Sequence, residues 1–111
     1  MKLAIPSIGR GGKRSRVSDV FAKAPYFTFV EIQGGEMSGA TVRENEASGM
    51  KQGAGPVVTK NLKDSGVDIV VAGEIGPGAK TLIEIGGIEL FTVEPGIVVS
   101  EAVRRFIASQ K

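Results

Sequence analysis

The sequence predicts an α/β fold in which helices flank a mixed sheet of five strands, giving three layers. In the first half, two strand-like runs joined by a pair of glycines indicate an antiparallel hairpin over residues 26–44. In the second half, apolar strands alternate with helical stretches from residue 56 to residue 109, which is typical of parallel β–α–β units. Because a chain of 111 residues has the size of one domain, we treat residues 1–111 as a single domain.

The first predicted element is a short strand over residues 2–6, which ends at a proline. A loop follows from residue 7 to residue 18, and its glycines separate four basic side chains: Arg10, Lys13, Arg14 and Arg16. The net charge of the whole chain is only +2, so this basic character is local and favours an anion site over a general coating of nucleic acid. We expect this basic loop to bury little surface; a solvated loop without a ligand is the alternative interpretation.

Residues 26–33 are rich in aromatic and β-branched side chains, which predicts the second strand. Gly34 and Gly35 allow the left-handed backbone of a tight turn, and residues 36–44 form the returning strand. The alternation of apolar and polar residues in the returning strand is weak. We therefore expect it at an edge of the sheet.

The second half begins with a helix predicted over residues 56–65, with Pro56 in its first turn and Gly66 after its end. An almost unbroken apolar run at residues 68–72 predicts a strand that is buried on both faces. A helix over residues 77–86, a strand over 88–93 and a helix over 98–109 complete the order, and the last helix carries an apolar stripe.

Two glycine-rich turns precede predicted helices, at residues 53–56 and 73–78. A helix start presents unpaired N–H groups and the positive end of the helix dipole, and both favour an anion. Because the turns lie in consecutive β–α units, we expect both to face one crevice. The alternative is that glycine only satisfies the geometry of a tight turn. The predicted binding residues combine both turns with the basic loop: Arg10, Lys13, Arg14, Arg16, Lys51, Gly53, Ala54, Gly55, Gly76 and Gly78.

The composition excludes several kinds of chemistry. The chain has no cysteine and no histidine, which removes disulfides, thiolate nucleophiles, cysteine or histidine ligation of metals and the commonest general base. The predicted first strand carries no acid, and Glu74 is the only carboxylate in a glycine turn, so a pair of catalytic metal ions has no ligand set. We expect no enzyme activity. No apolar run is long enough for a membrane span, and we expect a cytoplasmic protein.

An ordered set of short motifs resembles the dinitrogenase iron–molybdenum cofactor biosynthesis family, whose members are nitrogenase accessory proteins. The motifs are Val20-Phe21-Ala22-Lys23-Ala24-Pro25-Tyr26-Phe27, Glu44-Asn45, Gly53-Ala54-Gly55, Gly66-Val67-Asp68, and Gly73 with Gly76-Pro77-Gly78-Ala79. The resemblance extends over nearly the whole chain. It implies a ribonuclease H-like fold and the binding or carrying of an iron–sulfur or iron–molybdenum cluster during nitrogenase assembly.

The sequence also departs from that family. Many relatives have histidines in the loop before the first glycine turn, whereas this chain has Ser48, Met50, Lys51 and Gln52 there. The second turn has Gly78 where asparagine is common in the family. The usual strong metal ligands are therefore missing, and a cluster could be held only through charge and backbone N–H groups.

We therefore expect a non-enzymatic protein that carries an anionic metal cluster, or its precursor, without cysteine or histidine ligands. One alternative is a metal-free regulatory or scaffold protein that acts through protein contacts, and another is a protein that binds a small anion. The expected partners are the cluster or a small anion and proteins of cofactor assembly, with neither nucleic acid nor a membrane. We expect a monomer or a weak dimer, with the edge strand as the dimer contact.

Overall fold

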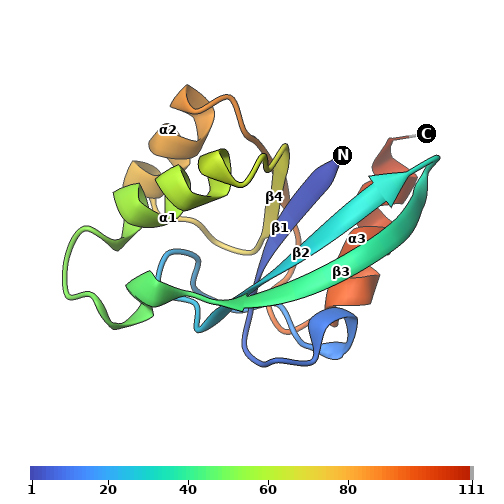
Figure 1. The fold of residues 1–111 in the computed structure, drawn as a ribbon, viewed down its shortest axis with the longest axis horizontal. Coiled ribbons are helices and arrows are strands. Elements are labelled where there is room, and N and C mark those ends of the chain that lie inside the picture. Colours follow the sequence, from blue (N-terminus) through green and yellow to red (C-terminus); the bar gives the residue numbers. More distant parts are fainter. Residues whose placement is uncertain (111) are drawn as a thin grey trace.

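The computed structural model describes residues 1–110, and a mixed five-stranded sheet forms its centre (Figure 1). In chain order, the strands are β1 (Lys2–Ser7), β2 (Tyr26–Gln33), β3 (Glu36–Glu44), β4 (Ile69–Ala72) and β5 (Glu89–Thr92). Their order across the sheet is β3-β2-β1-β4-β5. β1, β2 and β3 pair antiparallel, whereas β1, β4 and β5 pair parallel. The predicted fold class is confirmed, and the strand order is compatible with a ribonuclease H-like arrangement.

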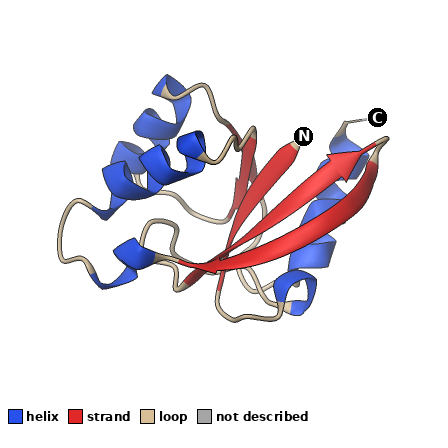
Figure 2. Ribbon diagram, viewed as in Figure 1, coloured by secondary structure: helices blue, strands red, loops and turns tan. Residues whose placement is uncertain are grey.

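Helices cover both faces of the sheet (Figure 2). α1 (Ala54–Asp64) and α2 (Pro77–Ile85) lie on one face, and α3 (Val99–Ser109) lies on the other. Two short 3-10 helices, η1 (Gly12–Arg14) and η2 (Glu46–Gly49), lie in the loops that follow β1 and β3. Within residues 1–110, no helix has the length and apolar character needed to cross a bilayer.

The start of α1 differs from the sequence prediction by two residues. We predicted a first residue at position 56, but the helix begins at Ala54 because Gly53 adopts a left-handed conformation, with φ 78° and ψ 11°, and ends the preceding loop. Pro56 is then the third helical residue, where a missing N–H group still costs no intrahelical hydrogen bond.

Alternate residues of the strands supply two hydrophobic cores, one on each face of the sheet. On the α1 and α2 side, Phe21 and Phe27 meet edge to face, with ring centroids 5.6 Å apart, and pack with Val58, Leu62 and Ile83. On the α3 side, Phe106 belongs to a separate core formed with residues of β1, β2 and β4. All four residues of β4 are buried, as its apolar run predicted.

The basic loop is anchored in the α3-side core, contrary to the expectation that it buries little. Val17 is 1% exposed, and its N–H donates to the carbonyl oxygen of Ile97 at 2.8 Å. Isolated β-bridges also pair Val17 with Ser7, and Arg16 with Val98. The loop is thus fixed between the end of β1 and the start of α3.

Candidate functional site

The starts of α1 and α2 open onto one cavity of about 590 Å³, which we call the glycine-turn cavity. Its walls come from three segments: residues 19–23, residues 51–55, and residues 74–77 with Ala79. A Cβ on Gly55 would lie 3.9 Å from the Cβ of Ala79, so the first turns of the two helices approach each other closely. The two glycine turns therefore face the same crevice, as their positions in consecutive β–α units predicted.

The first turn of α1 leaves its backbone donors free of a side-chain cap. Gly53 occupies the N-cap position and, within the described residues, no side chain accepts a hydrogen bond from the start of this helix. The left-handed φ of 78° requires glycine at this position. The N–H groups of Ala54 and Gly55, both in the cavity wall, belong to the first helical turn and have no intrahelical acceptor.

The start of α2 is arranged in a similar way. Gly76 is the N-cap, Pro77 occupies the first helical position, and no side-chain cap is present in the described part of the chain. Gly76, Pro77 and Ala79 line the cavity. Gly78 is exposed and lies outside the lining, although its N–H group belongs to the same first turn.

The charged lining of the glycine-turn cavity is balanced. Lys23 and Lys51 contribute two positive charges, and Asp19 and Glu74 contribute two negative charges; all four side chains are exposed. The remaining wall is largely apolar and includes Phe21. The cavity therefore combines flexible ammonium groups, fixed N–H groups of two helix starts and an apolar surface.

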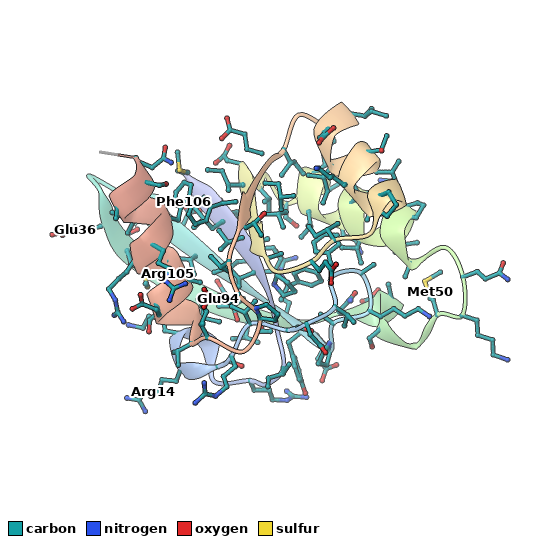
Figure 3. All side chains as sticks on the ribbon, turned by 180° about the vertical axis from the view of Figure 1, so that it is seen from behind. Arg14, Glu36, Met50, Glu94, Arg105 and Phe106 are labelled. Carbon is teal, nitrogen blue, oxygen red and sulfur yellow. The ribbon has the colours of Figure 1, made fainter. Side chains whose placement is uncertain are left out.

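The predicted cations of the basic loop do not line the glycine-turn cavity. Lys13 and Arg14 line a different cavity beside α3, and the Arg16 guanidinium donates to the carbonyl oxygen of Gly96 at 2.8 Å. Figure 3 shows Arg14 and Met50, which precedes the first glycine turn, at well-separated ends of the molecule. The sequence predicted that the basic loop and both glycine turns form one site. The structure does not bring them together, because the backbone of the loop is hydrogen-bonded to the start of α3.

Arg10 lies against the sheet edge. Its guanidinium stacks over the Tyr26 ring, 5.2 Å from the centroid, donates to the Tyr26 hydroxyl and pairs with Glu44. The hydrogen bond and the charge interaction with Tyr26, and after them the charge of Glu44, raise the pKa of Arg10 above its ordinary value. These contacts hold the basic loop beside β2 and β3, so Arg10 has a structural role there.

Sequence reasoning did not assign a role to Asn45, which organises one wall of the glycine-turn cavity. Its Nδ2 donates to the carbonyl oxygens of Ala22 and Ala24, both at 2.8 Å, and its Oδ1 accepts from the N–H of Ala47 at 3.1 Å. Asparagine is a common N-cap residue, and Asn45 caps η2, a short helix that was not predicted from the sequence; the residue type was the one signal available.

The cavity offers hydrogen-bond donors rather than metal ligands. Among residues 1–110 no group of three His, Cys, Asp or Glu side chains comes close enough to hold a metal ion. Backbone N–H groups at helix starts and lysine ammonium groups suit ligands that carry negative charge on accepting atoms. The arrangement can therefore hold an anion by charge and hydrogen bonding.

Comparisons with known proteins give a consistent picture. The family model described as dinitrogenase iron-molybdenum cofactor matches residues 1–109. The apo form of the orange protein from Desulfovibrio gigas is similar in structure, with a TM-score of 0.87 and 27% identity, covering 98% of this chain and 88% of that one. The crystal structure of PH0822 has a TM-score of 0.81 and 31% identity, covering 98% and 92%. Uncharacterized protein MJ0580 from Methanocaldococcus jannaschii is 29% identical over 91 residues, which is 82% of this chain and 73% of that protein.

Proposed function

The chain belongs to the dinitrogenase iron–molybdenum cofactor family, and we propose that it is a carrier of an anionic iron–sulfur or iron–molybdenum cluster, or of a precursor of one. The cluster is its cargo and occupies the glycine-turn cavity. The protein performs no chemical step on the cargo. This role agrees with the similarity to the orange protein, whose structure is that of an apo form.

One observation carries this proposal: two helix starts, neither capped by a side chain of the described residues, open onto one cavity. The start of α1 brings the N–H groups of Ala54 and Gly55, and the start of α2, where Pro77 has no N–H, brings that of Ala79; both starts also turn the positive end of a helix dipole toward the same space. Hydrogen bonds to an anion are stronger than those between neutral groups, so the two starts together favour a negatively charged guest.

The donors in the cavity fit a cluster held without coordination. Sulfide and carboxylate atoms of such a cargo accept hydrogen bonds, and two of the residues that line the cavity, Ala54 and Gly55, have first-turn N–H groups without an intrahelical acceptor. Lys23 and Lys51 are exposed at the rim and add charge. A cargo held in this way can leave without exchange of a metal–ligand bond, which suits delivery to another protein.

The test is anaerobic gel filtration after mixing the protein with isolated iron–molybdenum cofactor. We expect the visible absorbance of the cofactor to elute with the protein. Replacing both Lys23→Glu and Lys51→Glu is expected to weaken retention about tenfold or more, because two attractive charges at the cavity become repulsive.

A matched control changes the same amount of charge elsewhere. Lys63→Glu with Lys80→Glu alters two exposed lysines outside the lining of the glycine-turn cavity, and retention is expected to stay as in the unaltered protein. Absence of absorbance in the protein fraction, or equal retention by both double variants, would contradict the proposed carrier.

The sheet edge favours one alternative function, a metal-free protein that acts through protein contacts. β3 is an edge strand of nine residues that are exposed or half-buried, so one side of its backbone is free to pair with another chain. A self-association through this edge would give a weak dimer. Light scattering at increasing protein concentration, with and without the isolated cofactor, separates this alternative from the carrier.

A further inference from the structure

A second cavity, on the α3 side of the sheet, is lined by basic side chains from two distant parts of the chain. It has a volume of about 570 Å³, and we call it the η1–α3 cavity. Its charged lining consists of Lys13 and Arg14 from η1 and Arg104 from α3. Met37, Val98 and Ser100 complete the wall, so the described lining contains no carboxylate. This differs from the balanced charges of the glycine-turn cavity.

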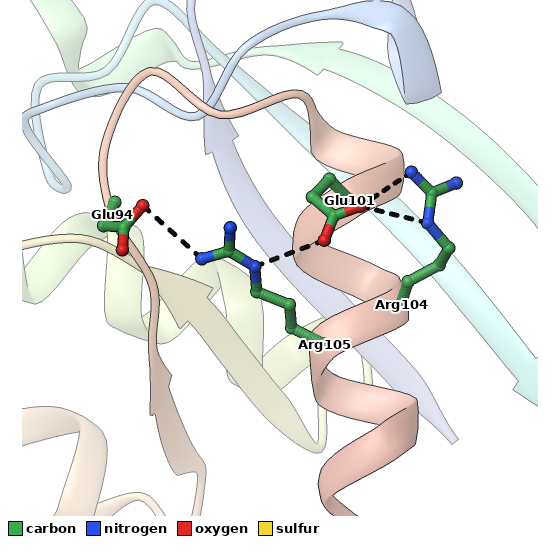
Figure 4. A network of polar contacts seen from close by, with 4 residues as sticks. All are labelled: Glu94, Glu101, Arg104 and Arg105. Atoms are coloured by element: carbon green, nitrogen blue, oxygen red, sulfur yellow. Dashed lines mark hydrogen bonds and ion pairs between the residues drawn. The ribbon is translucent and has the colours of Figure 1, made fainter.

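Nearby carboxylates leave this cavity with an excess of positive charge. Glu101 accepts from Arg104 at 2.8 Å and from Arg105 at 3.3 Å, and Arg105 also reaches Glu94 at 3.5 Å (Figure 4). These two carboxylates are therefore shared between two arginines. Lys13 and Arg14 form no ion pair within residues 1–110.

The backbone that carries Lys13 and Arg14 is fixed relative to α3. The N–H of Val99, the first residue of α3, donates to the carbonyl oxygen of Ser15 at 2.8 Å, and Arg16 forms a β-bridge with Val98. Ser15 is buried, and its hydroxyl accepts from the N–H of Gly9 at 3.0 Å. Binding a ligand would then order three side chains and no backbone, which keeps the entropic cost low.

The positions of the donors define the ligand chemistry. Three cationic residues and Ser100 line one space, beside the positive end of an eleven-residue helix. A phosphate group offers more accepting oxygens and more negative charge than a carboxylate, so it satisfies more of these donors at once. Met37 and Val98 add an apolar wall for the rest of a small molecule.

We propose that the η1–α3 cavity binds a small ligand through a phosphate group, with Lys13, Arg14 and Arg104 as its anion contacts. This site is separate from the glycine-turn cavity and shares no lining residue with it. It goes beyond the proposed carrier function and does not depend on it.

The test is a titration of the ¹⁵N-labelled protein with inorganic phosphate and with adenosine monophosphate, followed by two-dimensional NMR at constant ionic strength with chloride as the reference anion. We expect saturable shifts of amide signals from residues 13–16 and 98–101. Replacing Lys13→Glu together with Arg14→Glu is expected to weaken the affinity for both probes about tenfold or more. The control pair Lys63→Glu with Lys80→Glu should change it less than about twofold.

Several results would overturn the proposal. No saturable shift at probe concentrations up to about 20 mM, at which a site with a Kd of about 2 mM would be about nine-tenths occupied, removes the site. Shifts confined to the glycine turns place the anion elsewhere. Binding of a short RNA through residues 13–16, with no response to either small probe, indicates a nucleic-acid surface instead.

If the double variant does not fold, the titration is repeated with Arg14→Gln. This side chain is exposed, and the substitution removes only one charge. Its affinity for phosphate is then expected to fall about threefold. An unchanged affinity contradicts the proposal. Since the carrier assay changes Lys23 and Lys51, failure of one proposal is distinguishable from failure of the other.

Discussion

The side-chain amide of Asn45 donates to the main-chain carbonyl oxygen of Ala24 at 2.8 Å, across 21 positions of the sequence. The same nitrogen donates to the carbonyl oxygen of Ala22, and Asn45 is only 8% exposed. One side chain thus joins the segment that carries Phe21 and Lys23 to η2, which leads to α1. The shape of the glycine-turn cavity depends on this connection.

Replacing Asn45→Ala is expected to lower the free energy of unfolding by about 2–4 kcal/mol, because it removes the partners of two carbonyl oxygens and one N–H group. Urea unfolding measures the change. The control is Asn61→Ala on the exposed side of α1, which should alter stability by less than about 0.5 kcal/mol. Equal effects of the two substitutions would show that the contacts of Asn45 contribute no net stability.

Gly73, in the second glycine turn, lies close to Pro95. A Cβ at position 73 would lie 3.1 Å from Cδ and 3.3 Å from Cγ of that proline, whose ring cannot rotate away. We expect Gly73→Ala to destabilise the protein by about 1–3 kcal/mol. Gly78→Ala, with no atom within 4 Å of the new Cβ, should stabilise α2 by up to about 1 kcal/mol. Thermal unfolding of both variants compares them, and a neutral Gly73→Ala contradicts the packing argument.

The Glu101 carboxylate makes the free energy of unfolding depend on pH. Hydrogen bonds from Arg104 and then from Arg105 lower the pKa of Glu101 below its ordinary value of 4.5. A carboxyl group whose pKa is lower in the folded state stabilises that state above its unfolded pKa, and the contribution is lost as pH falls through the folded value.

We therefore expect Glu101→Gln to reduce the free energy of unfolding at pH 7 and to have a smaller effect at pH 3, as measured by urea unfolding. The effect at pH 7 should shrink in 1 M salt, since the pairs are exposed. Glu84→Gln, which removes a carboxylate without an ion pair among the described residues, is the control. An effect of Glu101→Gln that does not vary with pH would contradict the role of these pairs.

Most of the fold could be predicted because its strands and helices carry local signals. The aromatic and β-branched run that forms β2 and the glycine pair after it fix the hairpin, and the apolar run of β4 identifies a strand covered on both sides. The convergence of the two glycine turns followed from the order of elements. The start of α1 was misplaced by two residues, because proline is tolerated at several positions of a first helical turn, and the other predicted bounds differ by at most one residue.

The position of the basic loop could not be predicted from local patterns. Its direction depends on backbone hydrogen bonds in which Ser15 accepts from Val99 and Val17 donates to Ile97, about 80 positions later, and no periodicity in the sequence reports such contacts. The charges of Lys13 and Arg14 indicated an anion site. Which cavity these two side chains line, however, depends on where α3 begins. The hydrogen-bond partners of Asn45 could not be predicted either, because they are main-chain atoms of a turn that is distant in the sequence.

Val17 decides whether the basic loop is held in place. It is 1% exposed, it belongs to the α3-side core, and its carbonyl oxygen accepts from the N–H of Gly96 at 2.8 Å. Val17→Ala is expected to destabilise the protein by about 1.5–3 kcal/mol, whereas Val20→Ala, at a side chain that is 46% exposed, should cost less than about 0.5 kcal/mol. Urea unfolding compares the two variants. If both substitutions cost the same small amount, the loop is not anchored at α3, and Lys13 and Arg14 lose the fixed backbone on which the η1–α3 cavity depends.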